Sequence, residues 1–213
     1  MASAIAFIFW LAILIFSAVI HEVSHGVVAE QLGDPTARLA GRLTLNPLKH
    51  LDFFGSFLLP VTLWFLTGGG IVFGWAKPVP YNPLNLKNPL AGAGKIAAAG
   101  PISNLFIAAV FGIILRIFSV AGLAAPFLME LFAVIVYVNI LLAVFNLVPI
   151  PPLDGSKVLF AILPKNESSY RLAFFLERYG MIIVLFFIFF GFQIIVPVIN
   201  FIFTLVTGQS FGY

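Results

Sequence analysis

Long apolar stretches alternate with short polar connections along the chain. The stretches cover residues 5–20, 53–66, 96–115, 127–148 and 181–206. The longest approach the roughly 20 residues that an α-helix needs to cross a hydrocarbon core. They are continuously apolar, whereas the strands of a membrane β-barrel alternate in polarity. The pattern therefore predicts a helical membrane protein.

The prolines between these stretches predict where the helices end. We expect helices over about residues 4–31, 91–118 and 127–148, with a shorter apolar stretch over 53–66. Proline lacks an N–H donor and disfavours helix in the residue before it. A cluster of prolines at 149, 151 and 152 therefore ends the 127–148 helix, and Pro197 is expected to kink the last apolar stretch.

Residues 71–89 are rich in proline and asparagine and are predicted to be extended or hairpin-like. The fold class is thus an all-α polytopic membrane protein with about five to six transmembrane helices. A re-entrant extended segment lies between the second and third of them. We see no repeat or linker, so residues 1–213 are interpreted as a single membrane domain, with its core at 4–160 and C-terminal helices over 165–207.

Composition supports a membrane setting. Hydrophobic residues make up 62% of the chain and charged residues 9%, far below the roughly one-quarter typical of soluble domains. The net charge of +3 is small, and no basic cluster interleaved with aromatic residues indicates nucleic-acid binding. A cleaved signal peptide is disfavoured because no basic region precedes the first apolar stretch. The chain has no cysteine, so any metal ion must be bound by histidines and carboxylates.

A metal-binding pattern ends the first apolar stretch, where His21, Glu22 and His25 follow one another. Residues four apart share one helix face, so the two imidazoles can bind one ion. A glutamate beside such a pair acts as general base on water that zinc acidifies. The alternative is a pair of core histidines bonded to backbone carbonyls. Ionisable residues in a hydrocarbon layer are usually functional, which favours the metal site.

A catalytic zinc ion normally has three protein ligands, so a third has to come from elsewhere. His50 lies beside Lys49 in a basic connection, where a surface role is expected. Asp154 follows the proline cluster at the end of an apolar helix, and Gly155 lets the backbone turn there. Irregular backbone at membrane depth is tolerated where it lines a cavity. Asp154 is therefore the candidate third ligand, and its alternative role is to cap the following short helix.

Three motifs in this order resemble the site-2 protease family of intramembrane metalloproteases, in its compact form without PDZ or CBS modules. They are His21-Glu22-x-x-His25, the run Gly100-Pro101-Ile102-Ser103-Asn104, and the proline-rich run from Asn146 to Asp154-Gly155. The stretch from Phe73 to Pro80 is also similar to this family, and the resemblance covers about residues 4–160.

The resemblance implies a zinc endopeptidase that cleaves transmembrane segments of other proteins. One zinc ion per chain is held by His21, His25 and Asp154, and Glu22 is the catalytic base. It also implies that Asn104 and Asn146 face the site and hold a substrate backbone or an oxyanion. A helix cap for Asn104 and an interhelical hydrogen bond for Asn146 are the alternatives. A membrane metal transporter or metal-binding protein using the same ligands is the alternative function.

Basic residues predict the orientation. Arg38, Arg42 and Lys49 follow the histidine motif, so the positive-inside rule places that end of the first helix at the cytoplasmic face. We expect a multi-pass protein of the plasma membrane with its active site toward the cytoplasm and with transmembrane proteins and the lipid bilayer as partners. Lys77 lies awkwardly within the re-entrant segment, and the sequence suggests no partner for it. Oligomeric state cannot be inferred.

Overall fold

The computed structural model describes residues 2–66, 68, 74, 76–123 and 125–211, and within them the chain is helical with no strand. Four helices are long and apolar enough to cross a membrane, counting residues 167–194 as one continuous span. Their spans are Phe7–Gln31 within α1 (Ala2–Gln31), α4 (Pro89–Val120), α5 (Pro126–Asn146) and Glu167–Ile194, which begins with α7 (Glu167–Phe186). The predicted helices over 4–31, 91–118 and 127–148 are confirmed to within about two residues.

Two shorter apolar helices account for the remaining stretches. A π-helical turn, η2 (Phe53–Leu58), leads into α3 (Leu59–Leu66). The last apolar stretch breaks after α7 into a π-helical turn, η4 (Phe187–Gly191), and a 3-10 turn, η5 (Phe192–Ile194), before α8 (Val196–Thr207). Pro197 stands in the first turn of α8, where proline is tolerated, so the break precedes it. Whether all six apolar helices cross a membrane stays a prediction.

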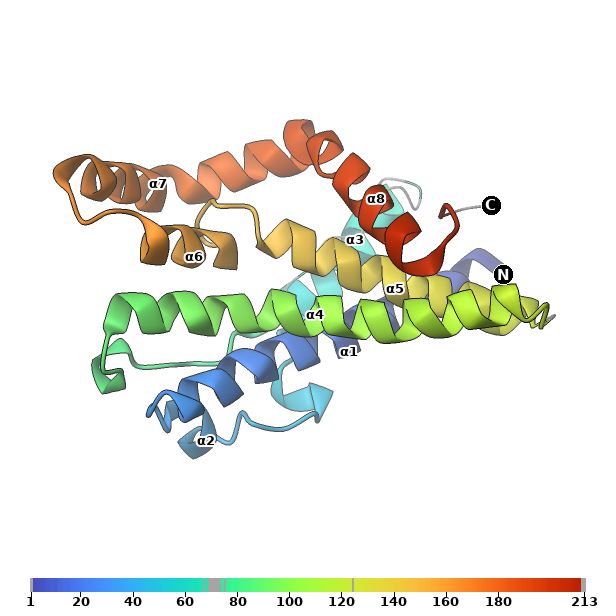
Figure 1. The fold of residues 1–213 in the computed structure, drawn as a ribbon, viewed down its shortest axis with the longest axis horizontal. Helices are drawn as coiled ribbons and strands as arrows, with labels where there is room; N and C mark the ends of the chain where they lie inside the picture. The colour runs from blue at the N-terminus through green and yellow to red at the C-terminus, as the bar shows by residue number, and fades with distance from the viewer. Residues whose placement is uncertain (1, 67, 69–73, 75, 124, 212–213) are drawn as a thin grey trace.

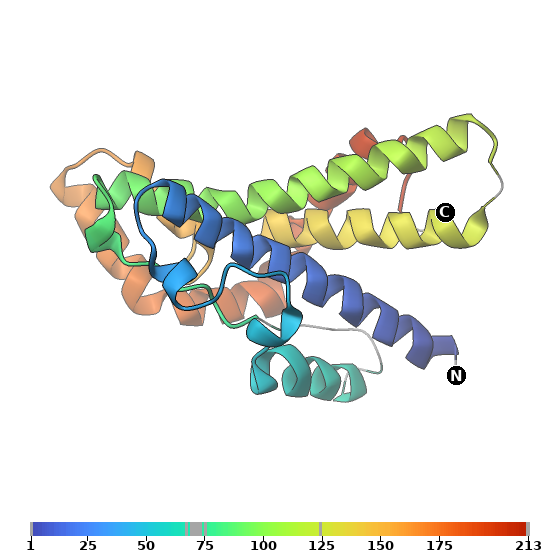
Figure 2. The same ribbon diagram turned by 90° about the horizontal axis from the view of Figure 1, so that it is seen from below.

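Helix α4 lies at the centre of the molecule and packs against α1, α5, α6 (Asp154–Ile162) and α8. Figure 1 shows α1, α4 and α5 running side by side, and Figure 2 shows that the C-terminal end of α1 lies beside the start of α4. A hydrophobic cluster that includes Ala108, Val136 and Ile199 joins α4, α5 and α8. Gly112 lets α4 and α8 approach closely, because a Cβ there would lie 2.2 Å from Val206 Cγ1.

The proline-rich segment is not helical over residues 76–82, as predicted, and a 3-10 turn, η3 (Pro83–Asn85), follows it. Residues 69–73 and 75, on which part of that prediction falls, lie outside the described residues. Its re-entrant course therefore stays a prediction. Lys77 has an exposed side chain, so it needs no buried partner.

Buried polar groups of the α1–α3 connection hold this segment in place. The connection also carries α2 (Thr36–Leu39) and a 3-10 turn, η1 (Pro47–Lys49). Asp34 is fully buried and accepts hydrogen bonds from Asn82 N at 2.6 Å and Asn85 Nδ2 at 2.7 Å. Arg42 Nη2 donates to Lys77 O at 2.7 Å. The segment is thus fixed beside the C-terminal half of α1.

Candidate metal centre

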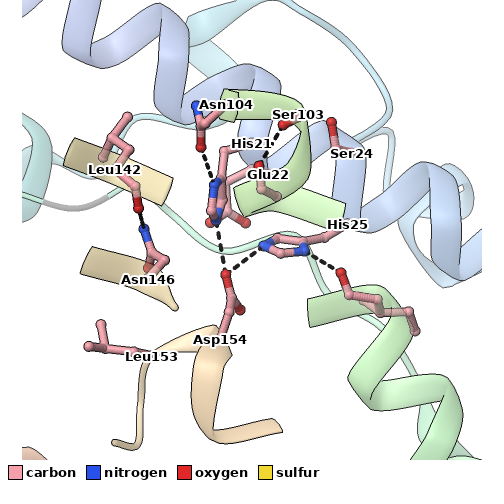
Figure 3. Close-up of polar contacts among 12 residues, drawn as sticks. His21, Glu22, Ser24, His25, Ser103, Asn104, Leu142, Asn146, Leu153 and Asp154 are labelled. Atoms are coloured by element: carbon pink, nitrogen blue, oxygen red, sulfur yellow. Dashed lines mark hydrogen bonds and ion pairs between the residues drawn. The ribbon is translucent and has the colours of Figure 1, made fainter. Parts of the chain in front are cut away.

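The three predicted ligands lie together in the structure, although Asp154 is 133 residues from His21 along the chain. His21 Nε2 lies 3.0 Å and His25 Nε2 lies 3.1 Å from the same oxygen, Asp154 Oδ2. One ligand atom from each residue lies within 4.8 Å of the other two. All three side chains are buried, and Figure 3 shows both imidazoles pointing toward the carboxylate.

Hydrogen bonds on the far side of each ring determine which nitrogen faces the centre. His25 Nδ1 lies 2.6 Å from Ile96 O, a carbonyl that can only accept, so Nδ1 carries the proton. His21 Nδ1 lies 2.6 Å from Asn104 Oδ1 and donates in the same way. In a neutral imidazole, each Nε2 then presents a lone pair toward Asp154.

The chemistry of this donor set fits a zinc ion. Two nitrogen lone pairs and a carboxylate oxygen within 4.8 Å of one another repel unless a cation or a proton lies between them. Two histidines and one carboxylate are a common ligand set of catalytic zinc, with a fourth position left for water or substrate. His21, His25 and Asp154 would therefore hold the metal, each histidine through Nε2.

The backbone that presents Asp154 depends on a glycine. A Cβ at Gly155 would lie 2.2 Å from Leu147 O, so only glycine allows the start of α6 to fold back against the end of α5. Leu153, not Asp154, occupies the N-cap position of α6. The capping role considered for Asp154 is therefore wrong.

A second glycine fits closely against His21. A Cβ at Gly100 of α4 would lie 2.4 Å from His21 Nε2 and 2.5 Å from Cε1. The imidazole thus lies directly on the α4 backbone, which limits how the ring can tilt. The Gly100-Pro101 motif therefore forms one wall of the candidate metal centre.

Asn104 supports His21 rather than facing an open site. It is fully buried within α4, and its Nδ2 donates to Asn139 Oδ1 at 2.9 Å and Ser17 O at 3.3 Å. Asn139 Nδ2 in turn donates to Ile135 O at 2.8 Å and Ser17 Oγ at 3.0 Å. The backbone carbonyls of Ser17 and Ile135 can only accept, so the NH₂ group of each asparagine has to face them. The Asn104 amide oxygen, Oδ1, therefore faces His21. The capping alternative for Asn104 is wrong, because it lies in the middle of a helix.

Asn139 and Ser17 were missed by sequence reasoning. Asn139 is fully buried in an apolar helix, and an isolated polar residue in such a helix is a recognisable signal. Ser17 precedes His21 by one helical turn and so shares its face. Both belong to the hydrogen-bonded support of the first ligand.

Glu22 and Asn146 lie beside the centre but do not take part in the hydrogen bonds that support His21. Glu22 is half-buried, and its Oε2 accepts a hydrogen bond from Val79 N at 2.8 Å. Asn146 is also half-buried, and its Nδ2 donates to Leu142 O of its own helix at 2.9 Å. The interhelical hydrogen bond considered for Asn146 is thus replaced by one within α5, as Figure 3 shows.

His50 is not on the surface, and that expectation was wrong. The imidazole is fully buried, and its Nε2 lies 2.8 Å from Thr44 O. His50 O also accepts a hydrogen bond from Lys77 N at 2.7 Å. The charged neighbour Lys49 suggested exposure, but packing against the extended segment decides the burial of His50. It is not in the group of possible metal ligands.

The chain is similar to known metalloproteases. Residues 116–191 match peptidase family M50. The chain is 37% identical over 194 residues to "Putative zinc metalloprotease YwhC" of Bacillus subtilis, with 88% of this chain and 84% of that relative covered. Identity is 31% over 181 residues to "Putative zinc metalloprotease Rip2" of Mycolicibacterium smegmatis, covering 84% and 65%. It is 28% over 187 residues to "Zinc metalloprotease MJ0392" of Methanocaldococcus jannaschii, covering 86% and 44%. No solved structure matches the chain.

Proposed function

The chain belongs to peptidase family M50, the site-2 protease family of zinc metalloproteases, and on that premise we propose that it is an intramembrane endopeptidase. Its substrates are transmembrane proteins, and it hydrolyses peptide bonds within or near their membrane-spanning segments. The observation that carries the proposal is the convergence of His21, His25 and Asp154 beside Glu22, among helices long enough to span a bilayer.

In this proposal the chain binds one zinc ion, and Glu22 moves the proton. Bound by His21, His25 and Asp154, the zinc ion would act as a Lewis acid, lowering the pKa of a water molecule and polarising the scissile carbonyl. The Glu22 carboxylate accepts the proton of the attacking water and passes it to the leaving amine. The hydrogen bond from Val79 N to Oε2 orients the carboxylate. Asn104 holds His21 in position, and the proposed role of Asn146 is to contact the substrate backbone.

We further propose that the centre lies toward the cytoplasmic face of a plasma membrane. The C-terminal half of α1, which carries His21 and His25, ends beside the start of α4, so the centre lies toward that end of the bundle (Figure 2). Arg38, Arg42 and Lys49 follow α1 at that end. Basic connections favour the cytoplasmic side.

A transmembrane substrate must lose its helical backbone hydrogen bonds before it is cleaved. If the unwound substrate pairs as an added strand with an extended segment of the enzyme, new backbone hydrogen bonds replace the lost ones. Residues 77–80 have few free donors for such pairing. The N–H groups of Lys77 and Val79 already bond His50 O and Glu22, and Pro78 and Pro80 have none. Strand addition would therefore use the part of the segment before Lys77.

The test compares Glu22→Gln and Asp154→Ala with the wild-type protein in liposomes that contain a transmembrane peptide. Glu22→Gln should still bind one zinc ion per chain while cleavage falls about a hundredfold to ten-thousandfold. Asp154→Ala should lose the zinc, as measured by elemental analysis. Undiminished cleavage by Glu22→Gln would show that the base is misassigned. Zinc flux across the liposomes without cleavage would favour the transporter instead.

A further inference from the structure

A pocket lies beside α1, on the face next to the one that carries the two metal-binding imidazoles. Its lining residues from α1 include Leu11, Ile15 and Ala18, and the other walls come from α3, α5 and the segment around Ala76. Residues three and four apart align along a helix, so Glu22 continues the stripe formed by Ile15 and Ala18. The pocket thus leads along α1 toward the proposed catalytic base.

His50 lines this otherwise largely apolar pocket, and one of its nitrogens has no partner. Its Nε2 faces Thr44 O, a carbonyl that can only accept, so in the neutral ring Nε2–H is the donor and Nδ1 is an acceptor. Nδ1 is buried and has no hydrogen-bond partner among the residues that the structure describes. Buried polar atoms are nearly always satisfied, so an unpartnered one in a residue that lines a pocket points to a missing donor.

We propose that this pocket binds a bulky apolar residue of the unwound substrate next to the scissile bond, and that His50 Nδ1 accepts a hydrogen bond from a substrate backbone N–H. The inference rests on the proposed function and identifies how that site holds its substrate. An extended peptide that has left its helix carries N–H groups in need of acceptors. The pocket offers the His50 acceptor among mainly apolar walls, which suits an apolar residue with a free amide.

The extended segment supports this choice of occupant. Gly74 and Ala76 line the pocket, and they lie before Lys77, in the part of the segment where we propose strand addition. Gly74 lies so close to α3 that a Cβ there would be 2.7 Å from Pro60 Cγ. His50 is tied to the same segment through Lys77 N. A substrate strand laid along Gly74 and Ala76 would therefore pass His50 on its way to Glu22.

The first test couples His50 to the substrate backbone. Each amide flanking the scissile bond of a transmembrane peptide is replaced in turn by an ester, which removes one N–H. We expect one position at which the ester lowers kcat/KM about tenfold. His50→Gln keeps a donor for Thr44 O but lacks the Nδ1 acceptor, so it should cause a similar loss with the all-amide peptide. Together, the ester and His50→Gln should cause no further loss.

The second test fills the pocket. Ala18→Phe places an aromatic ring in it, and we expect kcat/KM to fall about tenfold for peptides with leucine or phenylalanine next to the scissile bond. Peptides with alanine there should be cleaved nearly as before. Ala12→Phe is the matched control, because Ala12 lies on the same helix with an exposed side chain outside the pocket. It should not change the preference.

The outcomes separate the inference from the function on which it rests. If the wild-type protein cleaves no transmembrane peptide, the proposed function fails. If it cleaves, but the losses from the ester and from His50→Gln add at every position, Nδ1 binds water or acts structurally and the inference is wrong. If Ala18→Phe showed the same preference among the peptides as the control Ala12→Phe, the pocket assignment would also be overturned. Zinc content, measured for every variant, should stay at the wild-type level.

Discussion

The metal centre and the neighbouring pocket treat buried polar atoms in opposite ways. At the metal centre, each imidazole has a fixed hydrogen-bond partner for Nδ1. Behind His21, a series of hydrogen bonds links Asn104 of α4 to Asn139 of α5 and Ser17 of α1. In the pocket, the buried His50 ring leaves Nδ1 without a partner in the described part of the chain. One region is complete in its hydrogen bonding, and the other is incomplete.

This difference teaches what each region is built to bind. A metal site needs ligands that are held in one orientation before the ion arrives, and hydrogen bonds behind the ligands provide it. A peptide-binding site must leave groups free for the peptide, at the expense of unsatisfied atoms when it is empty. Substitutions in the two regions should therefore affect different measurements, metal affinity in one and substrate selection in the other.

The largest effect is expected at Gly100. Gly100→Ala places a methyl group 2.4 Å from His21 Nε2, so the ring has to leave its position. We expect zinc affinity to fall on the order of a hundredfold or more, measured by competition with a chelator. Gly92→Ala in the same helix is the control, because its Cβ would meet the flexible end of Leu86. If Gly100→Ala binds zinc as tightly as Gly92→Ala does, the metal centre is less rigid than proposed.

A smaller effect should separate the two asparagines. Asn104→Ala removes the acceptor for His21 Nδ1, and we expect zinc affinity to fall about tenfold to a hundredfold. Asn146→Ala breaks only a bond within α5, so zinc affinity should stay within about twofold while peptide cleavage declines. Chelator competition and cleavage assays on both variants measure this. Equal loss of zinc by both would show that the two residues share one role.

The smallest effect concerns Asp34, whose hydrogen bonds with Asn82 and Asn85 hold the extended segment in place. Burial raises the pKa of Asp34, but hydrogen bonds from Thr36, Asn85 and Asn82 outweigh it, so the pKa is lowered. A lowered folded-state pKa means that Asp34 stabilises the protein above the unfolded-state pKa of about 4. This stabilisation is lost as the pH falls through the lower folded-state value.

The substitution Asp34→Asn tests whether the charged Asp34 carboxylate stabilises the protein. An asparagine Nδ2 facing Asn82 N–H puts two donors together, and we expect a loss of about 1–3 kcal/mol of stability at pH 7. The difference in Tm between variant and wild type, measured in detergent, should shrink below about pH 4. Loss of zinc in acid affects both proteins alike, so the difference reports on Asp34. A difference that does not change with pH would contradict a charged Asp34.

The local elements of this protein follow from its sequence. Apolar runs of suitable length and the prolines between them predicted α1, α4 and α5 closely, because helical hydrogen bonds and proline sterics act over a few residues. The same short range placed His21 and His25 on one face of α1. Asp154 was reached through its proline setting and the family resemblance rather than through spacing.

Only the tertiary structure decided which distant residues meet. Nothing local indicates that Asn104 and Asn139 would share hydrogen bonds with Ser17, or that the Gly100 backbone would lie against His21. The burial of His50 was predicted wrongly because a charged neighbour says little about packing against a segment 27 residues later. Helix periodicity is set by neighbours along the chain, whereas burial and side-chain partners are set by how helices pack.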